Sequence, residues 1–207
     1  MANKLQSFFA KNKKFILYLF IEVFFVLIVL MIDLLTKKYI YGKIKVTGED
    51  IILIPNVLRF TAVENTGASF GMMKNSTKFL SYVSLFSVIL LFAFIVFTIK
   101  DRNPLLRTAL VLITAGGFGN MIDRFKYEYV RDFVYFELIN FPVFNFADSA
   151  LTIGCILAII WVIVYFSKKI KDDKNKKHLD DNDSDVDNKN FWFMSLYNFN
   201  SHCDNRL

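Results

Sequence analysis

The chain has 207 residues and a formal net charge of +6, and 55% of its residues are hydrophobic and 17% aromatic. These fractions exceed those of ordinary soluble globular domains, so the composition excludes a small soluble domain and favours a membrane protein. The only histidines are His178 and His202, and the only cysteines are Cys155 and Cys203. Both histidines lie near the C-terminus, which excludes a histidine-ligated zinc site or a Ser–His nucleophile in the apolar part of the chain.

Four apolar runs approach the roughly 20 residues that cross a hydrocarbon core. They cover about residues 15–32, 79–99, 105–122 and 147–166. The first run is longer than the apolar region of a signal peptide and no small-residue cleavage site follows it, so a retained helix is expected. The sequence therefore predicts a membrane all-α core of four transmembrane helices, contained in residues 1–167.

The connections between these helices differ in length and composition. Lysine and arginine gather before the first run, between the second and third, and after the fourth, and such flanks favour the cytoplasm. Both termini are therefore predicted to be cytoplasmic, with the longer connections on the extracytoplasmic face. Residues 46–73 are rich in β-branched residues and are expected to form short strands, whereas residues 127–144 are expected to form an interfacial connection.

The segment after the fourth run, residues 168–207, begins with alternating blocks of lysine and aspartate. Its charged part contains too few apolar residues to offset the entropy of ordering. A disordered cytoplasmic tail is therefore predicted.

Two of the apolar runs carry the same polar pattern at their outer ends. In "AGGFGNMIDRF", Asn120 and Asp123 share one helix face, and "FNFADSALT" repeats Asn-x-x-Asp with Asn145 and Asp148. Since one run leaves the membrane where the next enters it, the two aspartates are expected at similar depth. Two carboxylates that share a site hold one proton between them at neutral pH. The ionised one can then activate water while the protonated one donates to a scissile carbonyl.

Other interpretations of these acids remain open. Asp123 can pair with Arg124 or another cation, and Asp148 can serve as a helix cap. A small ion or proton carrier is an alternative function, although carriers tend to place such groups near the bilayer midplane. Asp132 is expected to cap or pair within the outer connection, and Glu22 to face a helix interface or a polar cavity.

Four motifs in this order among four spans resemble lipoprotein signal peptidase, also called signal peptidase II. They are "ENTGASFGM", "AGGFGNMIDR", "VRDF" and "FPVFNFADSA". The resemblance implies an aspartic endopeptidase of the bacterial cytoplasmic membrane that cuts prolipoproteins before a diacylglyceryl-modified cysteine. It implies a monomer that works beside membrane lipid, with no cofactor, metal or nucleic acid.

The resemblance also assigns site residues. The catalytic pair falls on Asp123 and Asp148. Positions that line the site or support the pair fall on Asn65, Gly67, Asn120, Arg124, Asn145 and Ala147. The family pattern Asp-Gln-x-Ser/Thr-Lys becomes "DLLTK" here, so Asp33 and Lys37 are carried over beside the alternative of an interfacial acid and a snorkelling lysine.

Overall fold

The structure, a computed structural model, describes residues 2–67, 77–100 and 103–203, and the side chains of residues 13–67, 77–100 and 103–175. The chain divides into two compact units, residues 1–159 and 160–207. The sheet and the polar cluster described below belong to the first unit. In the second unit, Trp161 stacks on Tyr165 with ring centroids 5.3 Å apart, and its described apolar side chains are exposed or half-buried, as on a lipid-facing helix.

The described part of the chain is mostly helical. Its helices are α1 (Ala2–Thr36), the π-helical turn η1 (Lys37–Tyr41), α2 (Gly42–Thr47), α3 (Thr77–Phe97), α4 (Pro104–Tyr127) and α5 (Phe146–Cys203). Four segments are long and apolar enough to cross a membrane: Lys13–Thr47, Thr77–Phe97, Pro104–Tyr127 and Phe146–Asn175. The prediction of four spans is confirmed. The first span continues through η1 and α2 without a break, well beyond the expected end at residue 32.

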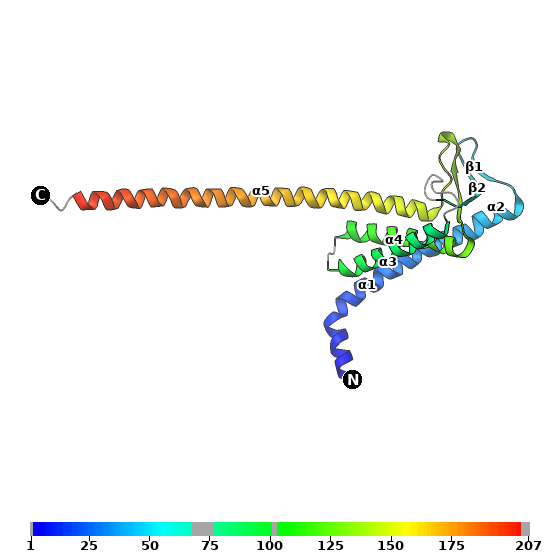
Figure 1. The fold of residues 1–207 in the computed structure, drawn as a ribbon, viewed down its shortest axis with the longest axis horizontal. Coiled ribbons are helices and arrows are strands. Elements are labelled where there is room, and N and C mark those ends of the chain that lie inside the picture. Colours follow the sequence, from blue (N-terminus) through cyan, green and yellow to red (C-terminus); the bar gives the residue numbers. More distant parts are fainter. Residues whose placement is uncertain (1, 68–76, 101–102, 204–207) are drawn as a thin grey trace. The chain divides into compact units, whose positions relative to one another are not determined.

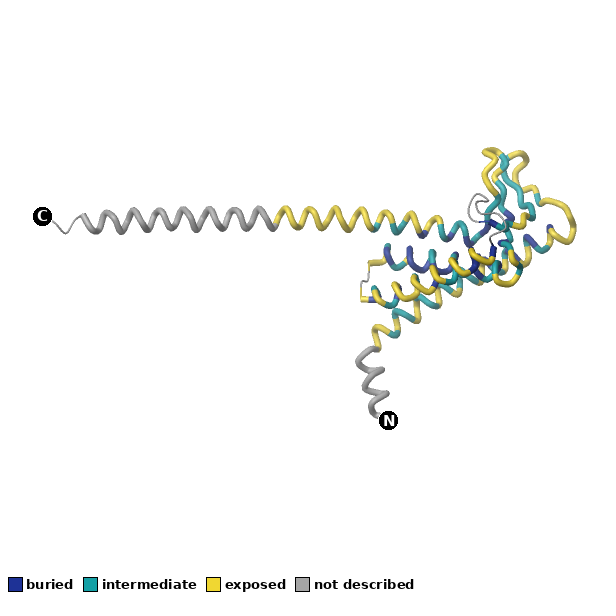
Figure 2. The backbone as a smooth tube through the Cα atoms, in the orientation of Figure 1, coloured by how far each residue is buried: buried dark blue, intermediate teal, exposed yellow. Residues whose placement is uncertain are grey.

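Helix α4 lies at the centre of the first unit, with α1 and α3 packed against it (Figure 1). In its most apolar stretch 56% of the residues are buried, compared with 22% for α3, 11% for α5 and none for α1. The buried residues gather along α4 and beneath the sheet, whereas the outer faces of α1 and α3 are exposed (Figure 2). These exposed faces carry large apolar side chains, as expected where lipid replaces water.

Local sequence explains where α4 begins. The side chain of Asn103 accepts hydrogen bonds from the backbone N–H groups of Leu105 and Leu106, at 3.0 and 3.4 Å. Pro104 occupies the first turn, where its missing N–H costs nothing.

The sheet has three antiparallel strands in the order β1 (Ile51–Ile54), β2 (Leu58–Asn65) and β3 (Val130–Phe136). The strands expected within residues 46–73 are β1 and β2, but residues 46 and 47 are helical and residues 68–73 lie outside the described part. Residues 127–144 were expected to form only an interfacial connection, whereas they supply β3 and the 3₁₀ turn η3 (Glu137–Ile139). Five of the seven residues of "VRDFVYF" are β-branched or aromatic, which favours a strand.

Helix α5 continues to Cys203, whereas the span was expected to end at residue 166. The charged segment is therefore helical in the structure, where its composition had favoured disorder. No glycine or proline follows Gly154, so the sequence offers no helix-breaking residue before Cys203.

Two glycines of α4 permit a close approach to neighbouring helices. A methyl group at Gly119 would collide with the Asp33 carboxylate of α1, and one at Gly116 would collide with the backbone carbonyl of Ala147 in α5. Gly117 faces α3 instead, where a methyl group would lie 3.3 Å from the end of the Val88 side chain.

We therefore expect Gly119→Ala to lower the free energy of unfolding by about 1–3 kcal/mol, because the added methyl overpacks a buried polar contact. Gly117→Ala is the matched control, since Val88 can shift by a few tenths of an ångström and alanine favours helix. Thermal unfolding of both variants in detergent compares them. Equal stability of the two would contradict the close approach described at Gly119.

Candidate active site

A fully buried lysine lies at the centre of a polar cluster where α1 meets the end of α4. The Lys37 ammonium group donates hydrogen bonds to Asp33 Oδ2 at 2.8 Å and Asn120 Oδ1 at 3.1 Å, and lies 3.3 Å from Asp123 Oδ2. Asp33 in turn accepts a hydrogen bond from the backbone N–H of Ala147 at 3.0 Å. The carboxylate of Asp33 thus ties α1 to the start of α5.

Asp123 is held by a second cation. Arg131 donates to it from Nη2 at 2.7 Å, from Nε at 3.2 Å and from its backbone N–H at 3.1 Å. Lys37 also contacts this carboxylate, so the fully buried Asp123 forms ion pairs with two cations. This is the cation pairing that the sequence left open, with Arg131 rather than Arg124 as the partner.

Asp148 lies in the first turn of α5 and is held by two asparagines. Its Oδ1 accepts a hydrogen bond from Asn120 Nδ2 at 2.7 Å, and its Oδ2 accepts one from the backbone N–H of Asn145 at 3.2 Å. The Asn145 side-chain oxygen accepts the backbone N–H of Asp148 at 2.9 Å. The cap that the sequence analysis gave as an alternative for Asp148 thus forms, through reciprocal hydrogen bonds with Asn145.

Asp132 of β3 faces the same asparagine. Asn145 Nδ2 donates to Asp132 Oδ1 at 2.6 Å, and Asn65 Nδ2 of β2 donates to Asp132 Oδ2 at 2.9 Å. Burial, followed by the nearby negative charge of Asp148, raises the pKa of Asp132 to about 7. The sequence predicted a cap or pairing role within the outer connection, whereas Asp132 belongs to the cluster.

The remaining predicted residues border this cluster. Arg124 Nη2 donates to the Gly67 carbonyl at 3.2 Å, and its guanidinium lies within electrostatic reach of Asp148, Asp132 and Asp123. Its buried Nε has no hydrogen-bond partner among the described residues. Gly67 also donates its N–H to Asn65 Oδ1 at 3.0 Å.

The structure thus brings every predicted site residue into one connected network. Its members are Asp33, Lys37, Asn65, Gly67, Asn120, Asp123, Arg124, Asn145, Ala147 and Asp148. Sequence reasoning missed the places of Arg131 and Asp132. A signal was present, because the alternation of "VRDFVYF" puts an acid on the strand face that carries Val130 and Val134. Within the described ranges, His, Cys, Asp and Glu form no group that could hold a metal ion.

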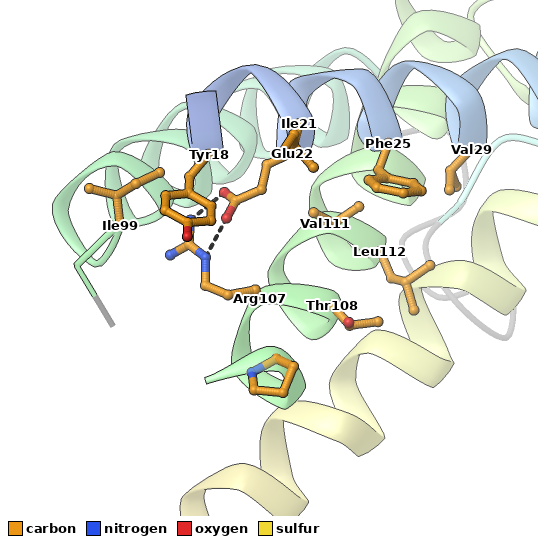
Figure 3. Close-up of a pocket in the computed structure, with 11 residues that line it drawn as sticks. Tyr18, Ile21, Glu22, Phe25, Val29, Ile99, Arg107, Thr108, Val111 and Leu112 are labelled. Atoms are coloured by element: carbon orange, nitrogen blue, oxygen red, sulfur yellow. Dashed lines mark hydrogen bonds and ion pairs between the residues drawn. The ribbon is translucent and has the colours of Figure 1, made fainter. Parts of the chain in front are cut away.

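The inner part of the helices holds a separate apolar cavity of about 410 Å³ between α1 and α4 (Figure 3). At its wall Glu22 accepts two hydrogen bonds from Arg107, one of them 2.6 Å from Nε to Oε1. Arg107 also donates to Thr98 at the end of α3, at 3.0 Å. The prediction that Glu22 faces a helix interface or a polar cavity is confirmed.

We expect Lys37→Met to lower the free energy of unfolding by about 3–5 kcal/mol, because the buried carboxylates lose the cation that they share. Lys38→Met is the matched control, since Lys38 is exposed and its substitution should change stability by about 0.5 kcal/mol or less. Thermal unfolding in detergent measures both. A Lys37→Met protein as stable as the unsubstituted chain would contradict the central place given to this lysine.

Comparison with known proteins agrees with this architecture. The family model described as signal peptidase II matches residues 25–164. A lipoprotein signal peptidase of Clostridium tetani is 36% identical over 145 residues, which cover 69% of this chain and 92% of the relative. One from Microcystis aeruginosa is 41% identical over 131 residues, covering 63% and 84%. A solved bacterial membrane enzyme is 33% identical with a TM-score of 0.63, covering 72% of this chain and 90% of its own. The chain therefore belongs to the signal peptidase II family of lipoprotein signal peptidases.

Proposed function

We propose that this aspartic endopeptidase removes signal peptides from prolipoproteins with Asp132 and Asp148 as its acid–base pair. The main support for this pair is a bridging contact: Asn145 donates a hydrogen bond from its side chain to Asp132 and another from its backbone N–H to Asp148. One residue thereby holds a carboxylate of the sheet beside a carboxylate of a membrane helix. The alternative of an ion or proton carrier has no support, because the chain belongs to a peptidase family.

The sequence pointed to Asp123 as the partner of Asp148, and the contacts favour Asp132 in its place. Asp123 is fully buried, and its oxygens are already engaged by Arg131 and Lys37. Asp132 instead has neutral amide donors from Asn65 and Asn145. Burial, followed by the charge of Asp148, raises the pKa of Asp132 to about 7.

The surroundings divide the two roles. Asp148 is half-buried and accepts hydrogen bonds from Asn120 and Asn145, so we assign it as the base that takes a proton from the attacking water. Asp132, with a pKa of about 7, is the acid that donates its proton to the oxygen of the scissile carbonyl. Water then adds to the carbonyl carbon, and collapse of the tetrahedral intermediate breaks the C–N bond as a proton passes to the leaving amine.

The charge balance of the cluster agrees with one shared proton. Four carboxylates face three cations, and the members are Asp33, Asp123, Asp132 and Asp148 against Lys37, Arg124 and Arg131. One carboxylate is therefore in excess. A single proton on the Asp132–Asp148 pair removes that excess, as in a carboxylate dyad.

The substrate and the orientation follow from where the cluster lies. We propose that the substrate is cut before a cysteine that carries diacylglyceryl, whose chains stay in the bilayer while the scissile bond reaches the helix ends. Lysine and arginine flank the opposite helix ends, which supports cytoplasmic termini and an extracytoplasmic site. We propose that the enzyme works as a monomer.

We expect Asp132→Asn and Asp148→Asn each to abolish turnover while leaving the protein folded, because asparagine keeps the shape of aspartate but cannot exchange the proton. The double variant should be no worse than either single one, since the two residues act as a unit. Rates are measured by cleavage of a lipidated prolipoprotein peptide, with insertion and thermal unfolding checked separately. Substantial turnover by Asp132→Asn would return the acid role to Asp123.

The same experiment gives a pH dependence. If the protonated Asp132 is the acid, kcat/KM of the unsubstituted enzyme should fall as pH rises through about 7, where this residue loses its proton. It should fall again at low pH, where the base of the pair is protonated. A profile without an alkaline decline would contradict the assignment of Asp132 as the acid.

The lipid should also determine the rate. A buried diacylglyceryl group contributes about 0.8 kcal/mol for each methylene, which holds the modified cysteine at the depth of the aspartates. A peptide that lacks the lipid should therefore be cut at least about a hundredfold more slowly at equal concentration. Equal rates for the two peptides would show that the lipid plays no part in recognition.

A further inference from the structure

Arg131 has no role in the acid–base chemistry proposed above, yet its side chain and its backbone both bind a residue of the cluster. Its guanidinium grips both oxygens of Asp123, and its own backbone N–H donates to the same carboxylate. The guanidinium carbon also lies 4.5 Å from the centre of the Tyr127 ring. Asp123 and Tyr127 both belong to the last turns of α4, so Arg131 is fastened to that helix on two sides.

Arg131 and the proposed acid Asp132 are neighbours in β3, so the contacts of one affect the position of the other. Arg131 directly precedes Asp132, and successive side chains of a strand point to opposite faces. The register agrees, because Arg131 is paired with Glu64 and Asp132 with Val63, and Asn65 reaches Asp132 from the same face as Val63. Arg131 thus grips α4 on one face of the strand while Asp132 meets Asn65 and Asn145 on the other.

We propose that Arg131 is a positioning residue which, by clamping Asp123, fixes the start of β3 on α4 and so places Asp132 beside Asp148. This inference rests on the proposed function, because it takes Asp132 and Asp148 as the reacting pair. The bond is strong for its type: a bidentate, charge-assisted contact within a buried site restricts the strand more than a single neutral hydrogen bond. The fork of arginine is required, since lysine supplies the charge but not two parallel donors.

The clamp also sets the charge of the cluster. The ionisable groups near Arg131 or its partner come from several elements: Asp33, Lys37, Tyr41, Glu64, Asp123 and Tyr127. Arg124, Asp132 and Asp148 complete the cluster beyond them. Removing Arg131 leaves one more uncompensated carboxylate, which raises proton affinity throughout the cluster. Removing Asp123 has the opposite effect, and removing both restores the original excess of one carboxylate.

Variants of Arg131 and Asp123 can therefore separate the effect of net charge from the effect of strand position. Arg131→Gln should lower kcat by about tenfold or more and move both limbs of the pH profile upward by roughly one unit. Asp123→Asn should lower kcat similarly but move the limbs downward. In the double variant the limbs of the pH profile should lie close to those of the unsubstituted enzyme, because the cluster again has one excess carboxylate. Its kcat should stay low, because the contact between Arg131 and Asp123 is still missing. Arg131→Lys should behave like the double variant, with normal limbs and a reduced kcat.

Arg59→Gln is the matched control. Arg59 lies in the same sheet and likewise stacks on a tyrosine, with its guanidinium carbon 5.0 Å from the Tyr135 ring centre. Its ion-pair partners, Asp50 and Glu137, lie outside the cluster. Its substitution should change neither kcat nor the pH limbs, and KM should stay within about threefold in every variant, because the clamp acts on the reacting groups and not on the lipid.

The full-length proteins are assayed in detergent with the lipidated peptide, and thermal unfolding verifies that each is folded. A normal kcat in Arg131→Gln, or limbs that do not return in the double variant, would overturn the positioning role. If Arg131→Gln does not fold, the double variant and Arg131→Lys decide the matter, since both keep the charge excess unchanged. The result is distinct from failure of the proposed function, which would appear as turnover by Asp132→Asn.

Discussion

The structure depends on one constraint, the burial of the Lys37 ammonium group at the end of a membrane helix. A charged group removed from water is unfavourable unless several partners surround it. Asp33, Asn120 and Asp123 supply these partners from α1 and α4. To bring them within reach, α1 must lie close against α4, which requires a glycine at position 119. The packing of the helices and the geometry of the polar cluster are therefore two aspects of the same interaction.

A second pair fixes the two helices at their other ends. Glu22 of α1 binds Arg107 of α4, and Lys37, the first residue of η1, meets Asp123 of α4. The separations along the chain are 15 residues from Glu22 to Lys37 and 16 from Arg107 to Asp123, so the two contacts are spaced almost equally along both helices. Parallel helices anchored at both ends cannot slide past one another without breaking a buried charge pair. This arrangement gives the cluster a rigid base, which a preorganised catalytic site requires.

Much of this organisation could be predicted from local sequence. The four spans follow from the length of apolar runs, and the repeated Asn-x-x-Asp follows from helical spacing, which placed Asn120, Asn145 and Asp148 together. The partner of each charge could not be predicted in this way. Glu22 and Arg107 are 85 residues apart, and Asp123 finds Arg131 only because β3 returns to the end of α4. Such pairings depend on how strands and helices meet in space, which neither periodicity nor composition specifies.

Asp132 shows why the residues of the reacting pair were harder to predict from the sequence than the helices. Asp148 lies in the first turn of a membrane helix, where it accepts hydrogen bonds from the Asn120 side chain and the Asn145 backbone N–H. A second acid that stays protonated near neutral pH needs a different environment, buried and close to a negative charge, and the sheet provides it. Building the pair from two kinds of element lets each carboxylate be adjusted by its own surroundings. Asn145 then joins the two, so that an acid from the sheet and an acid from a membrane helix are held beside each other by one shared neighbour.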